Sequence, residues 1–147
     1  MRERGLVHVY LDASVVLRRL FRSPDAISIW EHWDTACSSE LLRVEVLRTI
    51  DRLFRQRELG EIEAVELRAT FLEWVECVDF VQLDSSLMSR ASDSFPVSLA
   101  TLDALHLATA LAWREQYGAP LALWTHDRQL ALAARSMGFE VEGISHS

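Results

Sequence analysis

Apolar and polar positions along the chain alternate between strand-like and helix-like patterns. Short runs that alternate with period two, or that are continuously apolar, predict strands at 6–11, 35–37, 78–83, 121–124 and 140–144. Segments with apolar residues at helical spacing predict helices that begin at 15 and at 24–33, 40–57, 61–76, 84–96, 101–118 and 127–138. Ser38 and Ser39 are expected to cap the helix that starts at 40, because a serine hydroxyl accepts a hydrogen bond from a first-turn amide.

Strands that are separated by helices predict right-handed crossovers and a mainly parallel sheet with helices on both faces. The expected fold class is therefore α/β, in a three-layer α/β/α arrangement. With 147 residues, half of them apolar, the chain has the size of one domain, 1–147, with a core at about 6–144. In such a sheet a ligand site lies beyond the carboxyl ends of the strands, where the strand order reverses.

Four acidic residues interrupt sequence that is otherwise apolar: Asp12, Glu45, Asp103 and Asp127. Asp12 and Asp127 follow predicted strands, and Glu45 and Asp103 can reach the same edge of the sheet from predicted helices. Carboxylates that are brought together in a partly apolar pocket repel one another and lose solvation, so they persist when a cation neutralises them or when some keep a proton. The oxygen ligands point to a hard divalent ion, Mg2+ or Mn2+.

Each acid, taken alone, also has a purely structural interpretation. Asp12 could cap the following helix, and Asp103 and Asp127 could favour the positive ends of their helices. Glu45 could pair with an arginine three residues on, Arg48. His106, which lies three residues after Asp103 on the same helical face, is more typical of a hydrogen-bonded structural histidine than of a metal ligand.

All fifteen basic residues are Arg, and the chain contains no Lys. This composition excludes mechanisms that rely on a lysine ammonium, such as P-loop ATPases, Schiff-base enzymes and receiver domains. A haloacid-dehalogenase-type phosphatase is disfavoured as well, because it needs a lysine and a second Asp where this chain has Ser14. The net charge of −7 argues against nucleic-acid binding through a generally basic surface. It leaves room for a nuclease whose metal ions supply positive charge at the scissile phosphate.

The chain has no run of about 18 uncharged apolar residues, so no membrane span is expected. The charged start at 1–4 is followed by a short apolar stretch, which is typical of a strand and not of a signal peptide. We therefore expect a cytoplasmic protein. Cys37 and Cys77 show neither metal-site nor disulfide spacing, and both are expected to be reduced and in or near the core.

The segments around the four acids form an ordered set of motifs. They are Asp12-Ala13-Ser14 within 9–16, Glu45 within 39–48, Asp103-Ala104-Leu105-His106 within 102–110, and Thr125-His126-Asp127 within 125–130, followed by Ala133, Ala134 and Gly138. In this order and context the chain resembles the PIN domains, and within them the VapC-type toxins of bacterial and archaeal toxin–antitoxin pairs. The resemblance extends from about residue 6 to 144. It implies a single PIN-like domain, metal-dependent endoribonuclease activity on RNA, and a small antitoxin that blocks the site.

Phosphodiester hydrolysis needs a nucleophilic water at neutral pH and relief of the charge that builds up on the phosphate, and Mg2+ or Mn2+ can supply both. Asp12, Glu45 and Asp103 are the candidate catalytic and metal-ligating residues. Asp127 is either a fourth ligand or acts through a bound water. The hydroxyls of Ser14 and Thr125 could orient a carboxylate or a metal-bound water, or could cap the helices beside them.

Arginines near the acids are candidate RNA-binding residues, since a guanidinium can hold a phosphate in a bidentate contact. They are Arg18, Arg19, Arg22, Arg43 and Arg48; solvated surface charge is the alternative. Apolar residues are numerous at 27–33 and at Leu67, Phe71 and Trp74. Core packing is the favoured interpretation of these, and a groove for an antitoxin segment or a second copy of the chain is the alternative.

The expected partners are an RNA substrate, a small antitoxin and a second copy of the chain in a homodimer. The serious rival to the enzyme is a non-catalytic PIN-like module that binds RNA or protein. Such a module would not need all four acids, and all four are present here.

Overall fold

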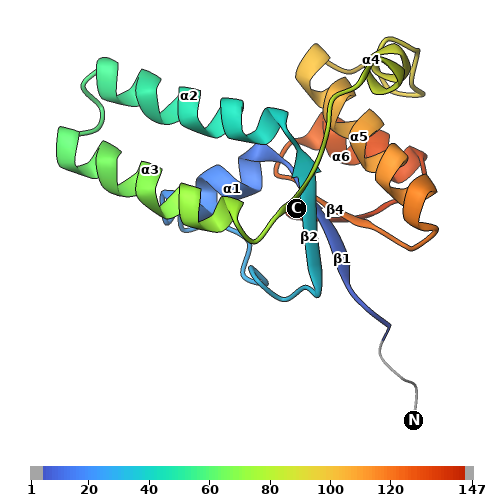
Figure 1. The fold of residues 1–147 in the computed structure, drawn as a ribbon, viewed down its shortest axis with the longest axis horizontal. Coiled ribbons are helices and arrows are strands. Elements are labelled where there is room, and N and C mark those ends of the chain that lie inside the picture. Colours follow the sequence, from blue (N-terminus) through green and yellow to red (C-terminus); the bar gives the residue numbers. More distant parts are fainter. Residues whose placement is uncertain (1–4, 145–147) are drawn as a thin grey trace.

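The computed structural model describes residues 5–144, whose strands form one five-stranded, all-parallel sheet in the order β3-β2-β1-β4-β5 (Figure 1). The strands are β1 (His8–Leu11), β2 (Thr35–Ser39), β3 (Asp79–Val81), β4 (Ala122–Trp124) and β5 (Glu140–Glu142). The helices are α1 (Ala13–Leu20), α2 (Leu41–Arg55), α3 (Glu61–Val75), α4 (Ser85–Ala91), α5 (Thr101–Tyr117) and α6 (Arg128–Ser136). The predicted three-layer α/β/α class with a parallel sheet is confirmed.

Helices α1, α2 and α3 lie on one side of the sheet and α5 and α6 on the other (Figure 1), and each face carries its own hydrophobic cluster. Val9 and Leu11 of β1 point to one face, where they meet buried residues of α1, α2 and α3. Tyr10, between them, points to the other face and packs with residues of α5 and α6. This division follows from the alternation of side chains along a strand. It also places Asp12, two residues after Tyr10, on the α5 side of the sheet.

Helices α2 and α5 bury different amounts of their surface, for reasons that are visible in their sequences. The buried residues of α2 are four apart, at Leu42, Val46 and Ile50, which is the stripe of a helix with one solvent face. Helix α5 is apolar nearly all round, because it contacts the sheet at β2, α6 and α4. Its boundaries match the predicted helix at 101–118 within one residue: it ends at Tyr117 and is capped by Gly118, whose φ of 59° is left-handed.

Two helix predictions are corrected by the structure. The predicted helix at 24–33 is wrong: this segment consists of tight turns, with the Ala26 amide donating to the Ser23 carbonyl. Glu31 has a φ of 70°, a left-handed conformation that interrupts an α-helix. The helix predicted at 84–96 is shorter than expected and ends at Ala91, where the Asp93 amide turns back to the Arg90 carbonyl.

Residues at the end of β2 also depart in part from expectation. The Ser39 hydroxyl accepts a hydrogen bond from the Leu41 amide, as a cap should. Ser38 instead donates to the Leu11 carbonyl at 2.7 Å and so ties β2 to β1. Cys37 is buried as predicted, whereas Cys77 is exposed, which corrects the expectation that both cysteines lie in or near the core.

The strand order places a topological switch point at β1. The chain leaves β1 toward β2 through α1, and β4 returns to pair with the opposite edge of β1. Ligands of parallel α/β sheets bind at this point, beyond the carboxyl ends of the strands. Asp12 and Asp127 lie just past the ends of β1 and β4.

The charged start at 1–4 lies outside the described residues. Among the helices of residues 5–144, none has the length and apolar composition of a membrane span.

Candidate active site

Asp12 is the most buried of the four acids, with 5% of its surface exposed. Its Oδ2 accepts one hydrogen bond from the Ser14 hydroxyl and one from the Thr125 hydroxyl, each 2.7 Å long. Although Asp12 stands at the N-cap position of α1, its side chain makes no capping hydrogen bond. The capping interpretation of Asp12 is therefore wrong, and the carboxylate is held in place by two hydroxyls.

Those two hydroxyls are themselves fixed by the segment that follows β4. The Ser14 Oγ accepts a hydrogen bond from the His126 amide at 2.9 Å, and the Thr125 Oγ1 accepts one from the Asp127 amide at 3.0 Å. Each hydroxyl thus uses its proton on Asp12 and a lone pair on the backbone. The ends of β1 and β4 are joined through Asp12, and its Oδ2 has little freedom to rotate.

Glu45 reaches the site from α2 and contacts His106 of α5 across the sheet edge. The Glu45 Oε1 lies 2.5 Å from His106 Nε2, and Asp12 Oδ1 lies 3.8 Å from the same nitrogen. His106 is completely buried, and its other ring nitrogen, Nδ1, lies 2.6 Å from the Tyr10 hydroxyl. The interpretation of His106 as a hydrogen-bonded histidine is confirmed, with one of the four acids as its partner.

Asp103 lies in the first turn of α5 and is half-buried. Desolvation, together with the negative charges of Asp127, Asp12 and Glu45, raises the pKa of its carboxyl to about 6. His106 acts in the opposite direction but does not cancel the shift. The four acids are thus close enough for their charges to interact, and the repulsion raises the pKa of Asp103.

Asp127 has a structural role of its own. Its Oδ1 accepts a hydrogen bond from the Leu130 amide at 2.9 Å, so the side chain caps α6. The structural interpretation of Asp127 is therefore confirmed. Capping occupies one oxygen and leaves Oδ2 for another partner, which is compatible with a ligand that acts directly or through a water.

The site's donor set can be compared with the demands of a divalent cation. Within residues 5–144, no three Asp, Glu, His or Cys side chains are gathered closely enough to ligate one ion directly. The chemistry of the set nevertheless fits Mg2+ or Mn2+, which take carboxylate and water oxygens. Asp12 Oδ1 and Glu45 Oε1 flank the same nitrogen of His106, so these two acids face one part of the site.

The candidate RNA-binding arginines are distributed over α1 and α2. Arg18 pairs with Asp25 at 2.8 Å, and Arg48 lies 3.8 Å from Asp51. Arg48 thus pairs with Asp51 and not with Glu45, so the structural alternative for Glu45 is wrong. Both pairs are solvent-exposed and therefore weak, and a phosphate can replace the carboxylate.

The remaining three arginines have different surroundings. Arg19 and Arg22 line a cleft opposite α3. Arg43 is exposed on α2 two residues before Glu45, and therefore projects from another side of that helix. The five arginines consequently do not form one continuous rim in this arrangement.

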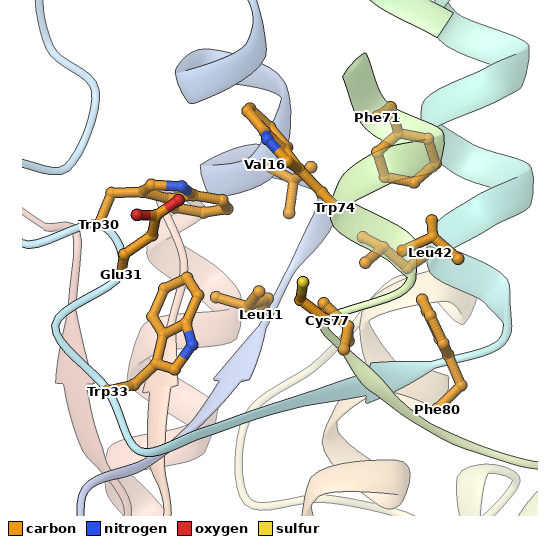
Figure 2. A pocket seen from close by; sticks show the side chains of 12 residues that line it. Leu11, Val16, Trp30, Glu31, Trp33, Leu42, Phe71, Trp74, Cys77 and Phe80 are labelled. Atoms are coloured by element: carbon orange, nitrogen blue, oxygen red, sulfur yellow. The ribbon is translucent and has the colours of Figure 1, made fainter. Parts of the chain in front are cut away.

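An aromatic cluster lies on the other side of the sheet, among α1, α3 and the turns at 24–33 (Figure 2). The ring centroid of Trp30 lies 5.0 Å from that of Trp33 and 5.1 Å from that of Trp74. Trp30 and Phe71 are buried, which confirms core packing for them. The cluster also borders a cavity of about 360 Å³, toward which the Cys77 thiol points (Figure 2).

Tyr10 is the residue of the site that sequence reasoning missed. The sequence pattern predicts for Tyr10 only a place in the first strand, yet its hydroxyl contacts His106. A signal was present, because Tyr10 and Asp12 are two residues apart in an extended segment and therefore share a face. His106 and Asp103 likewise share a face of α5. If this face packs against the strand, the pair Tyr10 and Asp12 comes to lie beside the pair Asp103 and His106.

Comparisons with known proteins agree with this geometry. A model of the PIN domain matches residues 9–136. Ribonuclease VapC46 of Mycobacterium tuberculosis (strain ATCC 25618 / H37Rv) is 30% identical over 138 residues, which are 90% of this chain and 95% of the relative. Ribonuclease VapC47 of Mycobacterium tuberculosis (strain CDC 1551 / Oshkosh) is 29% identical over 139 residues, 89% of this chain and 93% of the relative. The chain therefore belongs to the PIN domain family and, within it, to the VapC-type proteins.

Proposed function

We propose that the protein is an Mg2+- or Mn2+-dependent endoribonuclease that hydrolyses RNA phosphodiester bonds. The observation that carries the proposal is the meeting of four acids at the switch point of the sheet, with a buried Asp12 and a raised pKa at Asp103. Such unneutralised carboxylates are typical of sites that bind a hard cation. The relatives named ribonucleases support RNA as the substrate class.

The residues of the chain would share the work as follows. Asp12, Glu45 and Asp103 hold the cation, and Asp127 acts as a fourth ligand or through a bound water. Ser14 and Thr125 keep Asp12 Oδ2 in one orientation, which leaves Oδ1 for ligation. The cation supplies a nucleophilic water at neutral pH and positive charge at the scissile phosphate.

RNA binding is proposed for the arginines of α1 and α2. The net charge of −7 repels a polyanion, so local positive charge near the acids has to offset this repulsion. Arg18 and Arg48, whose carboxylate partners are exposed, are the most readily recruited. Arg19, Arg22 and Arg43 would contact phosphates farther along the strand.

The relatives' names also support a place in a toxin–antitoxin pair. We propose that the protein is the toxin and that a small antitoxin blocks the acidic site. A basic side chain of the antitoxin, most simply an Arg, would pair with the carboxylates and exclude the cation.

A second candidate function has one observation in its favour. Within residues 5–144, no three acidic, His or Cys side chains lie close enough together to ligate one ion. This spacing would suit a non-catalytic module that binds RNA or protein. The two candidates differ in one property that is simple to measure, the dependence of RNA cleavage on divalent cations.

Cleavage should require Mg2+ or Mn2+ and stop in EDTA, because the chain has no lysine and the site has no pair of catalytic histidines to replace the ion. The measurement is gel analysis of an RNA pool incubated with the purified protein, with and without chelator. Asp12→Asn should reduce the cleavage rate by at least about 100-fold, because the site loses a ligand charge. The matched control is Asp51→Asn, an exposed acid on α2 that pairs only with arginines, and it should cleave normally. Full activity in EDTA would refute the mechanism, and no cleavage under any condition would favour the binding module.

A further inference from the structure

A chain of buried hydrogen bonds runs through the protein to Glu45 and ends there. It starts at Tyr10 of β1, which is fully buried, and passes through the ring of His106, which is fully buried as well. The Tyr10 hydroxyl lies 2.6 Å from His106 Nδ1, and His106 Nε2 lies 2.5 Å from Glu45 Oε1. Three elements that are distant in sequence, β1, α5 and α2, are joined in this way.

Both ends of the imidazole are held, so its orientation is determined by its partners. Tyr10 is fully buried, and a phenol keeps its proton at neutral pH. In neutral His106, the Tyr10 hydroxyl donates to Nδ1 and the ring proton stays on Nε2. In charged His106, both nitrogens carry protons. In either form, an N–H group at Nε2 donates to Glu45.

This donor stands between two acids that repel each other. Nε2 lies 2.5 Å from Glu45 Oε1 and 3.8 Å from Asp12 Oδ1. Donation to Oε1 fixes the plane of the Glu45 carboxylate and leaves Oε2 without a partner among residues 5–144. A flexible Glu on a half-exposed part of α2 is thereby directed to the side of the site where Asp12 lies.

We propose that Tyr10 and His106 are positioning residues, which hold the Glu45 carboxylate in the orientation that a divalent cation requires. The inference rests on the proposed function, because it concerns the same cation. Neither residue touches substrate or ion in this scheme. They restrict the Glu45 side chain before the cation binds, so that less rotational freedom is lost on binding. Hydrogen-bond partners of metal ligands act in this way in general.

A purely structural role is the competing explanation, since both residues belong to the interior. The two amide residues separate these roles at position 106. The amide of Gln is placed like Nε2 and can donate to Glu45, whereas the shorter Asn is placed like Nδ1 and can contact only Tyr10. His106→Gln and His106→Asn therefore remove opposite halves of the chain of hydrogen bonds. Tyr10→Phe removes the hydroxyl alone and keeps the ring.

The experiment measures Mn2+ affinity by isothermal titration calorimetry and thermal stability in EDTA for each variant, with Leu111→Ala as the control for general destabilisation of α5. Leu111 is buried in that helix about two turns beyond Asp103. His106→Asn should bind Mn2+ about 10-fold more weakly than the wild type, and Tyr10→Phe, which keeps a donor to Glu45, should lose about threefold. His106→Gln should retain affinity within about threefold, and Leu111→Ala should lose stability without losing affinity.

The outcomes separate this inference from the proposed function. Equal affinity of His106→Asn, His106→Gln and the wild type would overturn the positioning role alone. Tighter binding by His106→Asn would overturn it also, because His106 would then compete with the cation for Glu45. Loss of affinity in Leu111→Ala equal to that in His106→Asn would assign the effect to folding. A wild-type protein that binds no Mn2+ would overturn the proposed function and this inference with it.

Discussion

Asp12 and Asp103 carry the same side chain in opposite settings. Asp12 is nearly inaccessible to solvent, yet two hydroxyl donors satisfy its Oδ2. Asp103 is only half-buried, yet the charges of its neighbours and its desolvation raise its pKa to about 6. Donated hydrogen bonds stabilise a carboxylate, whereas like charges destabilise it. The cost of gathering the acids is therefore concentrated at Asp103.

Asp103→Asn should abolish RNA cleavage and stabilise the cation-free protein at neutral pH. The folded pKa of about 6 lies above the ordinary value of 3.8, so the folded state holds the proton more tightly than the unfolded state. Stability should then fall as pH rises from about 4 to about 6, and the loss should persist above that range. At pH 7.5 the variant should gain about 1 kcal/mol, a figure reduced for solvent screening at a half-exposed group.

The measurement is urea denaturation in EDTA at about pH 4.5 and 7.5. The charges that face Asp103 come from Asp12, Glu45, Asp127 and His106, and all four remain in the variant. The gain should therefore be larger at pH 7.5 than at pH 4.5. A variant that is less stable than the wild type at pH 7.5 would show that Asp103 is held by contacts that outweigh the repulsion, as a structural N-terminal acid of α5 would be.

At the scale of elements, the ends of β4 and β5 determine where the Asp12 donors stand. The Thr125 amide donates to the Glu142 carbonyl at 2.9 Å, and His126 Nδ1 lies 2.7 Å from the Gly143 carbonyl oxygen. Gly143 has a φ of 110°, and a Cβ at this position would collide with the Thr125 carbonyl oxygen. The segment after β5 can lie this close to β4 only because position 143 is a glycine. This close contact holds Thr125 in place.

Gly143→Ala should displace Thr125 and reduce cleavage by about 10-fold or more, since Asp12 loses a fixed donor. Stability should fall by about 2 kcal/mol from the strained φ and the backbone collision. Gly118→Ala is the matched control: its φ is 59°, but no atom lies within 4 Å of the added Cβ. It should lose about 1 kcal/mol and cleave RNA normally. Equal loss of activity in the two variants would contradict a specific role for the β4–β5 contact.

At the scale of the whole molecule, the acids and the aromatic cluster lie on different sides of the sheet edge. Asp12 and Asp103 lie on the side of α5, and the cavity of about 360 Å³ lies among α1, α3 and the turns that precede β2 (Figure 2). Desolvation of both partners offsets much of the attraction in a charge pair, so pairing with the acids alone would not give tight inhibition. An antitoxin that binds tightly would need apolar contacts as well, and the cavity offers them.

Antitoxin and Mn2+ should compete for the wild-type protein, because a basic antitoxin side chain and the cation require the same carboxylates. Trp30→Ala would be a poor probe of the apolar contact, since Trp30 belongs to the core. Cys77→Phe is better, because Cys77 is exposed and borders the cavity, which the larger side chain would fill. It should weaken antitoxin binding by about 10-fold or more, and Cys77→Ser, which leaves the cavity open, should not. Affinity that is indifferent to Mn2+ and to Cys77→Phe would place inhibition on another surface.

Much of the fold followed from local patterns in the sequence. The α/β class, the five strands and the limits of α5 could be predicted, because period-two and helical spacing report which face of an element is buried. The segment 24–33 could not be predicted. Ile27 and Trp30 are buried there as helical spacing suggests, but turns bring them to the core and Glu31 takes a left-handed conformation.

The sequence by itself determined which residues could form the site, and the tertiary structure decided how they interact. Strand ends and helix starts placed four acids at one edge of a parallel sheet, which is a consequence of topology and can be inferred from element order. The hydrogen bonds of Asp12 to Thr125 and of Glu45 to His106 join residues that are 113 and 61 positions apart. Such pairings depend on angles between packed elements and on side-chain rotamers, which no local pattern encodes. For this reason the sequence can place Tyr10 on the same face as Asp12, but only the folded protein shows its contact with His106.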